Sequence, residues 1–187
     1  MGKVFSSLAI RNYRIYFIGV LFTNIGQWMA RTAQSWLVLT ELTNNSASAL
    51  GTLTALMFLP QLVLVPVAGR VADRFPKRRT LLICQVVGGI DAVALGLLVV
   101  TGHVELWMVY LIAVIDGTAI TFDGPSRQAF VGEMVPLSQL PNAIGLNSAS
   151  FNAARLFGPG IAGVLIAILG TGPVILWNVL SFISTGV

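Results

Sequence analysis

The chain has 187 residues, of which 56% are hydrophobic and 10% are charged, and its net charge is +4. Soluble domains carry about 25% charged residues, so this composition excludes a soluble globular protein and indicates an integral membrane protein. The positive charge does not require a nucleic-acid partner, because basic residues of membrane proteins gather on their cytoplasmic connectors. A single cysteine excludes a disulfide within the chain.

Long apolar runs predict membrane-spanning helices. A helix needs about 20 mostly apolar residues to cross about 30 Å of hydrocarbon. Five runs reach this length, and a sixth is still continuing at the last residue. All are too long, and too apolar on every side, for the strands of a barrel. The expected spans lie near residues 13–39, 50–68, 80–101, 106–130 and 143–169, with the start of a sixth at 173–187.

Polar side chains recur through the first expected span with helical spacing. They stand at positions i, i+3, i+7 and i+10, which lie on one narrow face of a helix. A charge in the bilayer is costly, so this stripe is predicted to face the bundle interior or a water-filled cavity. Its members are Asn24, Gln27, Arg31 and Gln34.

The second and third spans are joined by a highly charged bend. Six of the eleven residues from Gly69 to Arg79 are charged, although the runs on either side are apolar. With five alternating crossings, every basic residue outside the membrane falls on the same side as this bend. The positive-inside rule then predicts a cytoplasmic N-terminus, and the expected location is the plasma membrane. The basic residues on that side are Lys3, Arg11, Arg14, Arg70, Arg74, Lys77, Arg78, Arg79 and Arg127.

The third span and the connector after it hold three residues with possible chemistry. Cys84 lies in an apolar run and is expected to be a small lipid-facing or core residue. Asp91 is open to two interpretations, proton carriage or a hydrogen bond to a neighbouring helix. His103 stands in a short connector with no other titratable cluster, so we expect an exposed side chain.

The fourth span carries a second polar face. Asp116, Asp123 and Arg127 share it by helical spacing. Asp116 is expected about halfway through the membrane, near the depth of Arg31, so the two are predicted to face inward. Direct pairing with Arg31 is one interpretation and pairing with Arg155 is the other. Asp123 is predicted to receive a basic side chain of the bend.

The fifth span carries a third polar face, formed by Ser148, Asn152 and Arg155. These three residues again share one side of a helix by their spacing. Asn152 and Arg155 are therefore predicted to line the same cavity as the stripes of the first and fourth spans.

The charged bend resembles the signature of the major facilitator superfamily, Gly-x-x-x-Asp-Arg/Lys-x-Gly-Arg-Arg/Lys. The matching positions are Gly69, Asp73, Arg74, Lys77 and Arg78, while a proline stands where the signature has its second glycine. "RNYRIYF" at residues 11–17, the stretch 122–166 and "NVLSF" at 178–182 are similar to one branch of that superfamily. That branch contains enterobactin-exporter-like and macrolide-efflux-like proteins.

The resemblance implies a fold and a set of roles. The superfamily has twelve helices in two six-helix halves, so this chain is expected to be the all-α N-terminal half, with its sixth helix truncated and the C-terminal half absent. Helices one and four of the family line its central cavity. The bend latches the two halves together in the outward-facing state, a role implied here for its five matching residues. Asp123 and Arg127 are the expected latch partners.

The motif "GPGIAG" at residues 158–163 resembles a shortened form of the helix-five motif of the superfamily's antiporters. Pro159 removes a backbone donor and favours a kink, and the glycines permit close packing. Gly158, Pro159 and Gly163 are therefore either a gating hinge or a packing contact.

The predicted function is secondary transport, with proton-coupled efflux of small amphipathic molecules by alternating access. Asp116 is then either the titrating carboxyl or one member of a structural ion pair. No Ser-His-acid set, metal-ligand spacing or phosphate-binding loop is present in the sequence, so no enzyme, cofactor or metal is predicted. The alternative is a half-length membrane partner or assembly subunit that does not itself transport.

Overall fold

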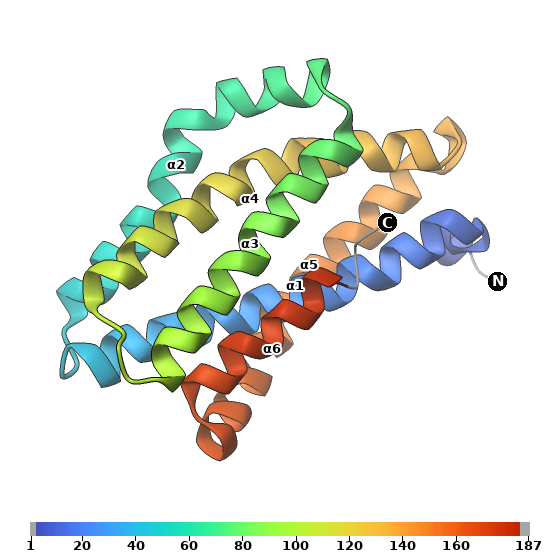
Figure 1. Cartoon of the computed structure of the whole chain (residues 1–187). Helices are drawn as coiled ribbons and strands as arrows, with labels where there is room; N and C mark the ends of the chain where they lie inside the picture. The colour runs from blue at the N-terminus through green and yellow to red at the C-terminus, as the bar shows by residue number, and fades with distance from the viewer. Residues whose placement is uncertain (1–2, 184–187) are drawn as a thin grey trace.

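The computed structural model describes residues 3–183, and within this range every regular element is helical (Figure 1). A short helix precedes α1, a π-helical turn continues it, and a one-turn helix precedes α5. The elements are η1 (Lys3–Ala9), α1 (Arg11–Trp36), η2 (Leu37–Leu42), α2 (Ala47–Arg74), α3 (Lys77–Val100), α4 (Leu106–Met134), η3 (Leu137–Gln139), α5 (Leu140–Leu169) and α6 (Thr171–Ile183).

Four of the described helices are long and apolar enough to cross a membrane, namely α2 to α5. α1 has 26 residues and is therefore about 39 Å long, but its polar stripe makes it less apolar than the others. The described part of α6 has 13 residues, and residues 184–187 of the expected sixth span lie outside the described residues. The expected all-α membrane architecture is thus confirmed, with four spans rather than five meeting the length and apolarity that a crossing needs.

The ends of the helices follow local chemistry. The Ser46 hydroxyl caps α2 by accepting from the Ala49 amide at 3.3 Å. α2 ends at Arg74, two residues before Pro76, which cannot continue a helix and instead stands at the N-cap of α3. Gly102 and Gly170, which end α3 and α5, have φ of 71° and 84°, a left-handed region that glycine adopts without strain. The signals at α2 extend this helix several residues beyond its apolar run at both ends, whereas α3 and α5 end within one residue of their predicted limits.

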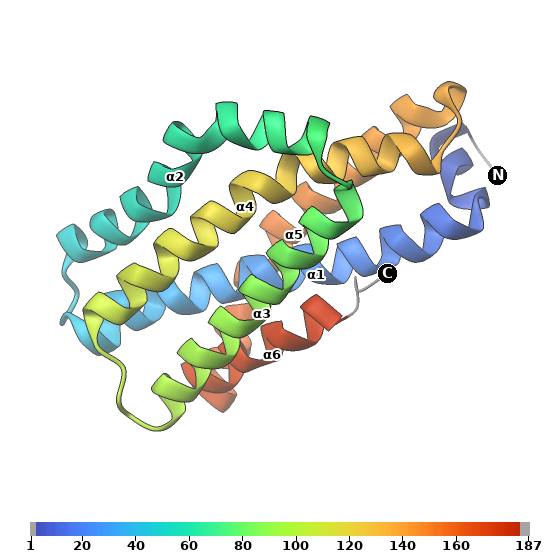
Figure 2. The same ribbon diagram turned by 45° about the horizontal axis from the view of Figure 1, so that its top comes forward.

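The bundle consists of two three-helix units, α1–α3 and α4–α6, and most contacts between helices join one unit to the other. α1 packs on α5 and α6, α4 packs on α2 and α3, and α3 meets α6 (Figures 1 and 2). The first helix of each unit therefore contacts the second and third helices of the other. Since α1 and α4 run in opposite directions, this is the arrangement of an inverted structural repeat.

One end of the bundle gathers the N-terminal segment, the α2–α3 bend and the α4–α5 connection (Figure 1). The Ser7 hydroxyl donates to the Asn142 side-chain oxygen at 2.6 Å, which ties the start of the chain to α5. Lys77 Nζ lies 3.2 Å from Glu133 Oε1, which joins the bend to the end of α4. The basic connectors that the sequence assigns to one side of the membrane therefore do lie at one end of the molecule.

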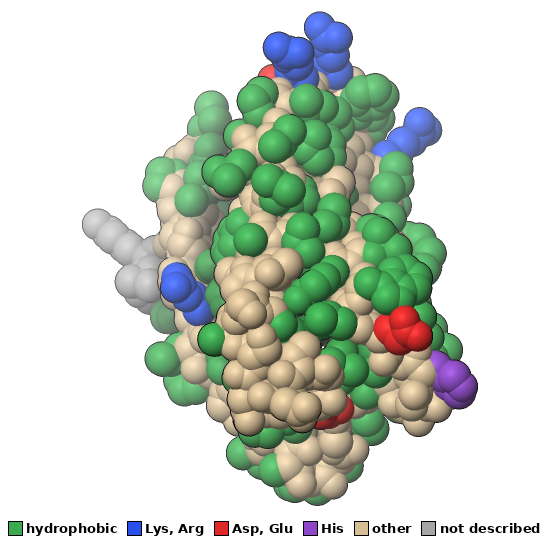
Figure 3. All heavy atoms as spheres, turned by 90° about the vertical axis from the view of Figure 1, so that its left-hand side faces the viewer, with side chains coloured by type: hydrophobic (Ala, Val, Ile, Leu, Met, Phe, Trp, Pro, Cys, Tyr) green, Lys and Arg blue, Asp and Glu red, His purple; other side chains and the backbone are tan. Residues whose placement is uncertain are grey.

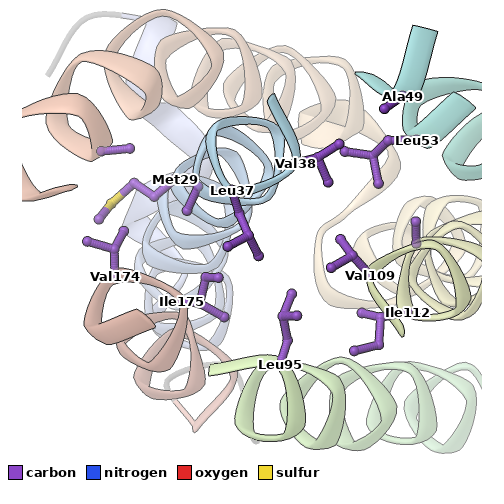
Figure 4. Close-up of a cluster of buried hydrophobic side chains, with 13 residues drawn as sticks. Met29, Leu37, Val38, Ala49, Leu53, Leu95, Val109, Ile112, Val174 and Ile175 are labelled. Atoms are coloured by element: carbon purple, nitrogen blue, oxygen red, sulfur yellow. The ribbon is translucent and has the colours of Figure 1, made fainter. Parts of the chain in front are cut away.

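Two apolar clusters fill the ends of the bundle and leave a polar layer between them. The larger cluster includes Leu37 of η2, Leu53 of α2, Leu95 of α3 and Ile175 of α6, and Figure 4 shows these side chains converging. The second cluster surrounds the fully buried Tyr13, near the start of α1. Outside the bundle, hydrophobic side chains are spread over the face in Figure 3 and only a few charged ones interrupt them. Such a surface suits lipid.

Candidate functional site

A polar cavity of about 40 Å³ lies between the two apolar clusters. It is bounded mainly by α1, α3 and α4, and more than half of its lining residues are polar or charged. In an otherwise apolar bundle this concentration of polar groups marks the candidate functional site. The lining residues are Gln27, Ala30, Arg31, Gln34, Met57, Cys84, Gln85, Gly88, Asp116, Ala119, Ile120, Asp123, Arg127 and Asn178.

Asp116 and Arg31 both line this cavity, as the sequence predicts. Their charges interact across it, but the pair is not joined by a salt bridge within the part of the chain that the structure describes. Instead, Gln34 Nε2 donates to Asp116 Oδ2 at 3.3 Å. The Arg31 guanidinium packs over the Trp28 ring, 5.1 Å from its centroid. Arg31 and Asp116 thus face each other with Gln34 between the two helices.

Asp123 makes a different contact from the predicted one. Its carboxylate accepts two hydrogen bonds from Arg127, at 2.8 Å to Nε and 3.0 Å to Nη2. The two residues are one helical turn apart on α4, so this fork-like pair forms within one element. Lys77 pairs with Glu133 instead, because Glu133 lies nearer the end of α4 where the bend arrives.

The polar stripe of α1 divides between two environments. Gln27, Arg31 and Gln34 line the cavity. Asn24 is buried outside the cavity, where its Nδ2 donates to Ser150 Oγ on α5 at 3.2 Å. The stripe therefore faces the bundle interior along its whole length, and its N-terminal member serves the α1–α5 contact.

The structure places the predicted polar face of α5 outside the cavity. Ser148, Asn152 and Arg155 are exposed, and the Asn152 amide donates back to the Ser148 carbonyl at 2.9 Å. The Arg155 guanidinium lies 5.7 Å from the centroid of the Trp28 ring. Helical spacing correctly puts these side chains on one face, but α5 packs on α1 through its opposite face. That face consists of Ala143, Leu146, Ser150, Ala154 and Gly158.

The bend residues are largely open to the surroundings. A Cβ on Gly69 would meet no atom within 4 Å, so the close approach that the glycine permits is not made by the described residues. Asp73, Arg74 and Arg78 have exposed side chains. The signature residues are thus presented on the surface of this bundle.

The glycine-proline motif lies within α5 and approaches α1 closely at Gly158. A Cβ on Gly158 would come within 2.7 Å of Trp28 Cβ, so glycine is needed for this close approach. A Cβ added at Gly163 would meet no atom within 4 Å. Gly158 is therefore a packing contact in this conformation.

Sequence reasoning missed two polar groups of the site, Gln85 and Asn178, and left the role of a third residue, Asp91, open. Gln85 and Asn178 line the cavity, and their signal was a polar side chain inside an apolar run. Asp91 is buried on α3, and its charge interacts with that of Asp116. Within the described part of the chain, the Asp91 Oδ2 atom has no hydrogen-bond partner. The centre of the bundle thus holds a second carboxyl beside Asp116.

Inverted structural repeats that surround a polar cavity near the middle of the membrane are typical of membrane transporters, and this bundle has that arrangement. The sequence profile of a family described as "Transmembrane secretion effector" matches residues 3–185. The chain belongs to this family of major facilitator superfamily transporters, which are not enzymes. The resemblance seen in the charged bend is therefore confirmed.

Relatives named as transporters or efflux proteins share this similarity. The chain is 30% identical to the multidrug efflux pump Tap of Mycolicibacterium fortuitum, over 80% of this chain and 37% of that protein. It is 27% identical to the staphyloferrin A transporter of Staphylococcus aureus, over 83% and 39%. It is 26% identical to macrolide efflux protein A of Streptococcus pyogenes, over 80% and 36%. The chain thus spans less than two-fifths of the length of each.

Proposed function

We propose that this chain is the N-terminal six-helix half of a secondary active transporter of the plasma membrane, which exports small amphipathic molecules in exchange for protons. The observation that carries the proposal is the polar cavity, where Arg31, Gln34 and Asp116 meet inside an apolar bundle. Charged side chains at such depth are costly and mark substrate or ion pathways.

Transport would proceed by alternating access, with two halves rocking about a site at the middle of the membrane. The cavity of about 40 Å³ within this half has room for water but is too small for an organic molecule. A second six-helix half, facing α1 and α4, would complete a site large enough for the cargo. The relatives named for macrolide efflux and for staphyloferrin A support amphipathic organic molecules as that cargo.

Asp116 is the proposed proton carrier. Its carboxylate attracts Arg31 across the cavity and accepts from Gln34, which are both on α1. Protonation removes the negative charge, so the attraction between α4 and α1 weakens. Proton binding on one side of the membrane and release on the other would thereby bias the two conformations.

The bend is the proposed latch between the halves. Gly69, Asp73 and Arg74 stand at or near the surface, where a second half would meet them in the outward-facing state. Arg74 suits a carboxylate or a row of carbonyls there, and Asp73 suits a helix N-terminus. Lys77, held by Glu133, would fix the bend to α4.

The test is transport in inside-out vesicles that carry the full-length protein, with radiolabelled erythromycin as the probe. Acidifying the vesicle lumen is expected to drive uptake at least about fivefold above the rate without a pH gradient. Asp116→Asn is expected to abolish this response to pH, because an amide cannot carry the proton. Uptake is measured by filtration at several lumenal pH values.

Glu105→Gln is the matched control, since Glu105 is an exposed carboxyl in the α3–α4 connector. It should leave uptake and its pH response unchanged. An Asp116→Asn protein that inserts normally and keeps the full pH response would overturn the coupling role. Uptake that ignores the proton gradient in the unmodified protein would overturn proton-driven export.

A further inference from the structure

A second cavity, separate in chemistry from the polar one, opens between α2, α3 and α4. Its volume is about 640 Å³, within the range of about 300–1,000 Å³ typical of ligand sites. It lies where α2 and α3 diverge after the bend, while α4 passes behind them (Figures 1 and 2). Two of its lining side chains, Phe75 and Ile83, are 58% and 64% exposed, so the cavity opens on the outer surface of the bundle, where lipid would lie.

The lining of this lateral cavity is almost wholly apolar. Val71 and Phe75 line it from α2 and its end, Ile83 and Val87 from α3, and Ile115 from α4. The lining has few polar groups, and one hydroxyl of α4 among them is already bonded to its own helix. An occupant therefore needs a long apolar part and no polar group along it.

The charged side chains near the lateral cavity lie at one end of it. Arg79 is its one charged lining residue, and the exposed Arg74 and Arg78 lie on the same bend. α3 begins here at Lys77 without a side-chain cap, so the positive end of its dipole adds to the arginines. An anionic group is favoured at this end.

The dimensions match one leaflet of a bilayer. From Arg79 to Val87 the cavity follows α3 for eight residues, or about 12 Å. One leaflet contributes about 15 Å of the 30 Å hydrocarbon thickness. The apolar length, the single charged end and the opening toward lipid are the features expected of a site for an anionic phospholipid.

We propose that this lateral cavity binds an anionic phospholipid, with one acyl chain between α2, α3 and α4 and its phosphate on Arg79 and the start of α3. The site shares Cys84 and Ala119 with the wall of the polar cavity, but it does not depend on the proposed proton coupling. The bound lipid would fill the space between α2 and α3 and thereby hold the bend that joins them. It would couple the conformation of the bend to the lipid composition of the membrane.

Filling the cavity tests the acyl-chain position. Val87→Phe and Ile115→Phe each place a ring where the chain would lie, while Val86→Phe adds the same ring at an exposed neighbouring position outside the cavity. The full-length protein is titrated with 1-palmitoyl-2-oleoyl-phosphatidylglycerol, and bound lipid is counted by native mass spectrometry. The two cavity variants are expected to bind at least about tenfold more weakly, and the control to bind as the unmodified protein does.

The headgroup position is tested by charge. The unmodified protein is expected to bind phosphatidylglycerol at least about fivefold more tightly than phosphatidylcholine with the same acyl chains. Arg79→Gln should remove this preference. Arg14→Gln, which removes an exposed basic residue of α1 at the same end of the bundle, should retain that preference. Retention of the preference in Arg79→Gln would overturn the assignment of the phosphate.

A third measurement needs no variant. Cys84 lines the lateral cavity and is the one cysteine of this chain. Its labelling by N-ethylmaleimide is followed on the tryptic peptide that contains it. Compared with protein in detergent alone, the labelling rate should fall at least about threefold when phosphatidylglycerol is added and should not fall when phosphatidylcholine is added. Equal labelling in both lipids would contradict the proposal. So would stoichiometric displacement of phosphatidylglycerol by erythromycin, because the cavity would then serve the cargo.

Discussion

At the scale of single residues, Asp123 and Arg127 form a buried ion pair on α4. Both side chains are mostly buried, with exposed fractions of 18% and 15%, and two hydrogen bonds join them. Burial removes both charges from water, so each depends on the other for compensation. By contrast, Glu133 is 58% exposed in its pair with Lys77, and such surface pairs contribute little.

Removing one member of the buried pair is expected to be costly. Asp123→Asn leaves Arg127 charged and buried without its carboxylate, which should destabilise the protein by about 3–5 kcal/mol. Arg127→Gln should cost a similar amount for the reciprocal reason. The measurement is the change in unfolding free energy of purified protein in detergent.

The double variant Asp123→Asn/Arg127→Gln separates charge compensation from simple packing. It should be more stable than either single variant, because no uncompensated charge remains. A double variant whose loss equals the sum of the single losses would show that the two residues act independently, and would contradict the interpretation.

At the scale of elements, α4 holds the bundle together by packing on both α2 and α3. Its contact with α2 depends on Gly117, where an added Cβ would collide with the Met57 carbonyl oxygen and approach Pro60. Backbone atoms cannot move aside as the end of a side chain can, so the two helices would have to separate. At Gly124, two turns further along α4, an added Cβ would meet no atom within 4 Å.

The substitution Gly117→Ala is therefore expected to destabilise the protein by about 1–3 kcal/mol. The matched change Gly124→Ala should be neutral or stabilising by up to about 1 kcal/mol, since alanine favours the helix and meets no neighbour. Thermal unfolding of both variants in the same detergent gives the comparison. Equal effects at the two positions would mean that the α2–α4 contact is not tight at Gly117.

Helix boundaries show what apolar runs do and do not predict about elements. The run at 50–68 marks the hydrocarbon-spanning part of α2, but the helix extends from Ala47 to Arg74. Its ends are decided by the Ser46 cap and by the break before Pro76, which are local hydrogen-bonding effects rather than hydropathy. A similar extension carries α4 four residues beyond its predicted end, to Met134.

At the scale of the whole molecule, the distribution of basic residues predicts orientation in the membrane. The bend and the N-terminal segment lie at one end of the bundle, and the α3–α4 connector with His103 lies at the other (Figure 1). The positive-inside rule then assigns the bend to the cytoplasm and His103 to the outside.

Cysteine labelling of intact cells tests this orientation. In a background with Cys84→Ser, the variant His103→Cys should react with a membrane-impermeant maleimide before the cells are opened. Arg70→Cys, in the bend, should react only after permeabilisation. Both side chains are exposed, so access to either thiol is limited by the membrane alone. Labelling of Arg70→Cys in intact cells would reverse the orientation.

The sequence alone determined the helical membrane class, the family and the face of each helix that carries polar groups. Those properties depend on composition, on the charged bend and on spacing along a single helix. Only the tertiary structure decided which polar faces meet. Ser148, Asn152 and Arg155 share a face of α5, yet α5 packs on α1 through the opposite face, so they lie outside the cavity. Asp123 likewise takes Arg127 from its own helix rather than a basic residue of the bend. Periodicity fixes directions around one helix axis, whereas the rotation of each helix against its neighbours follows from close packing, which involves residues far apart in the sequence.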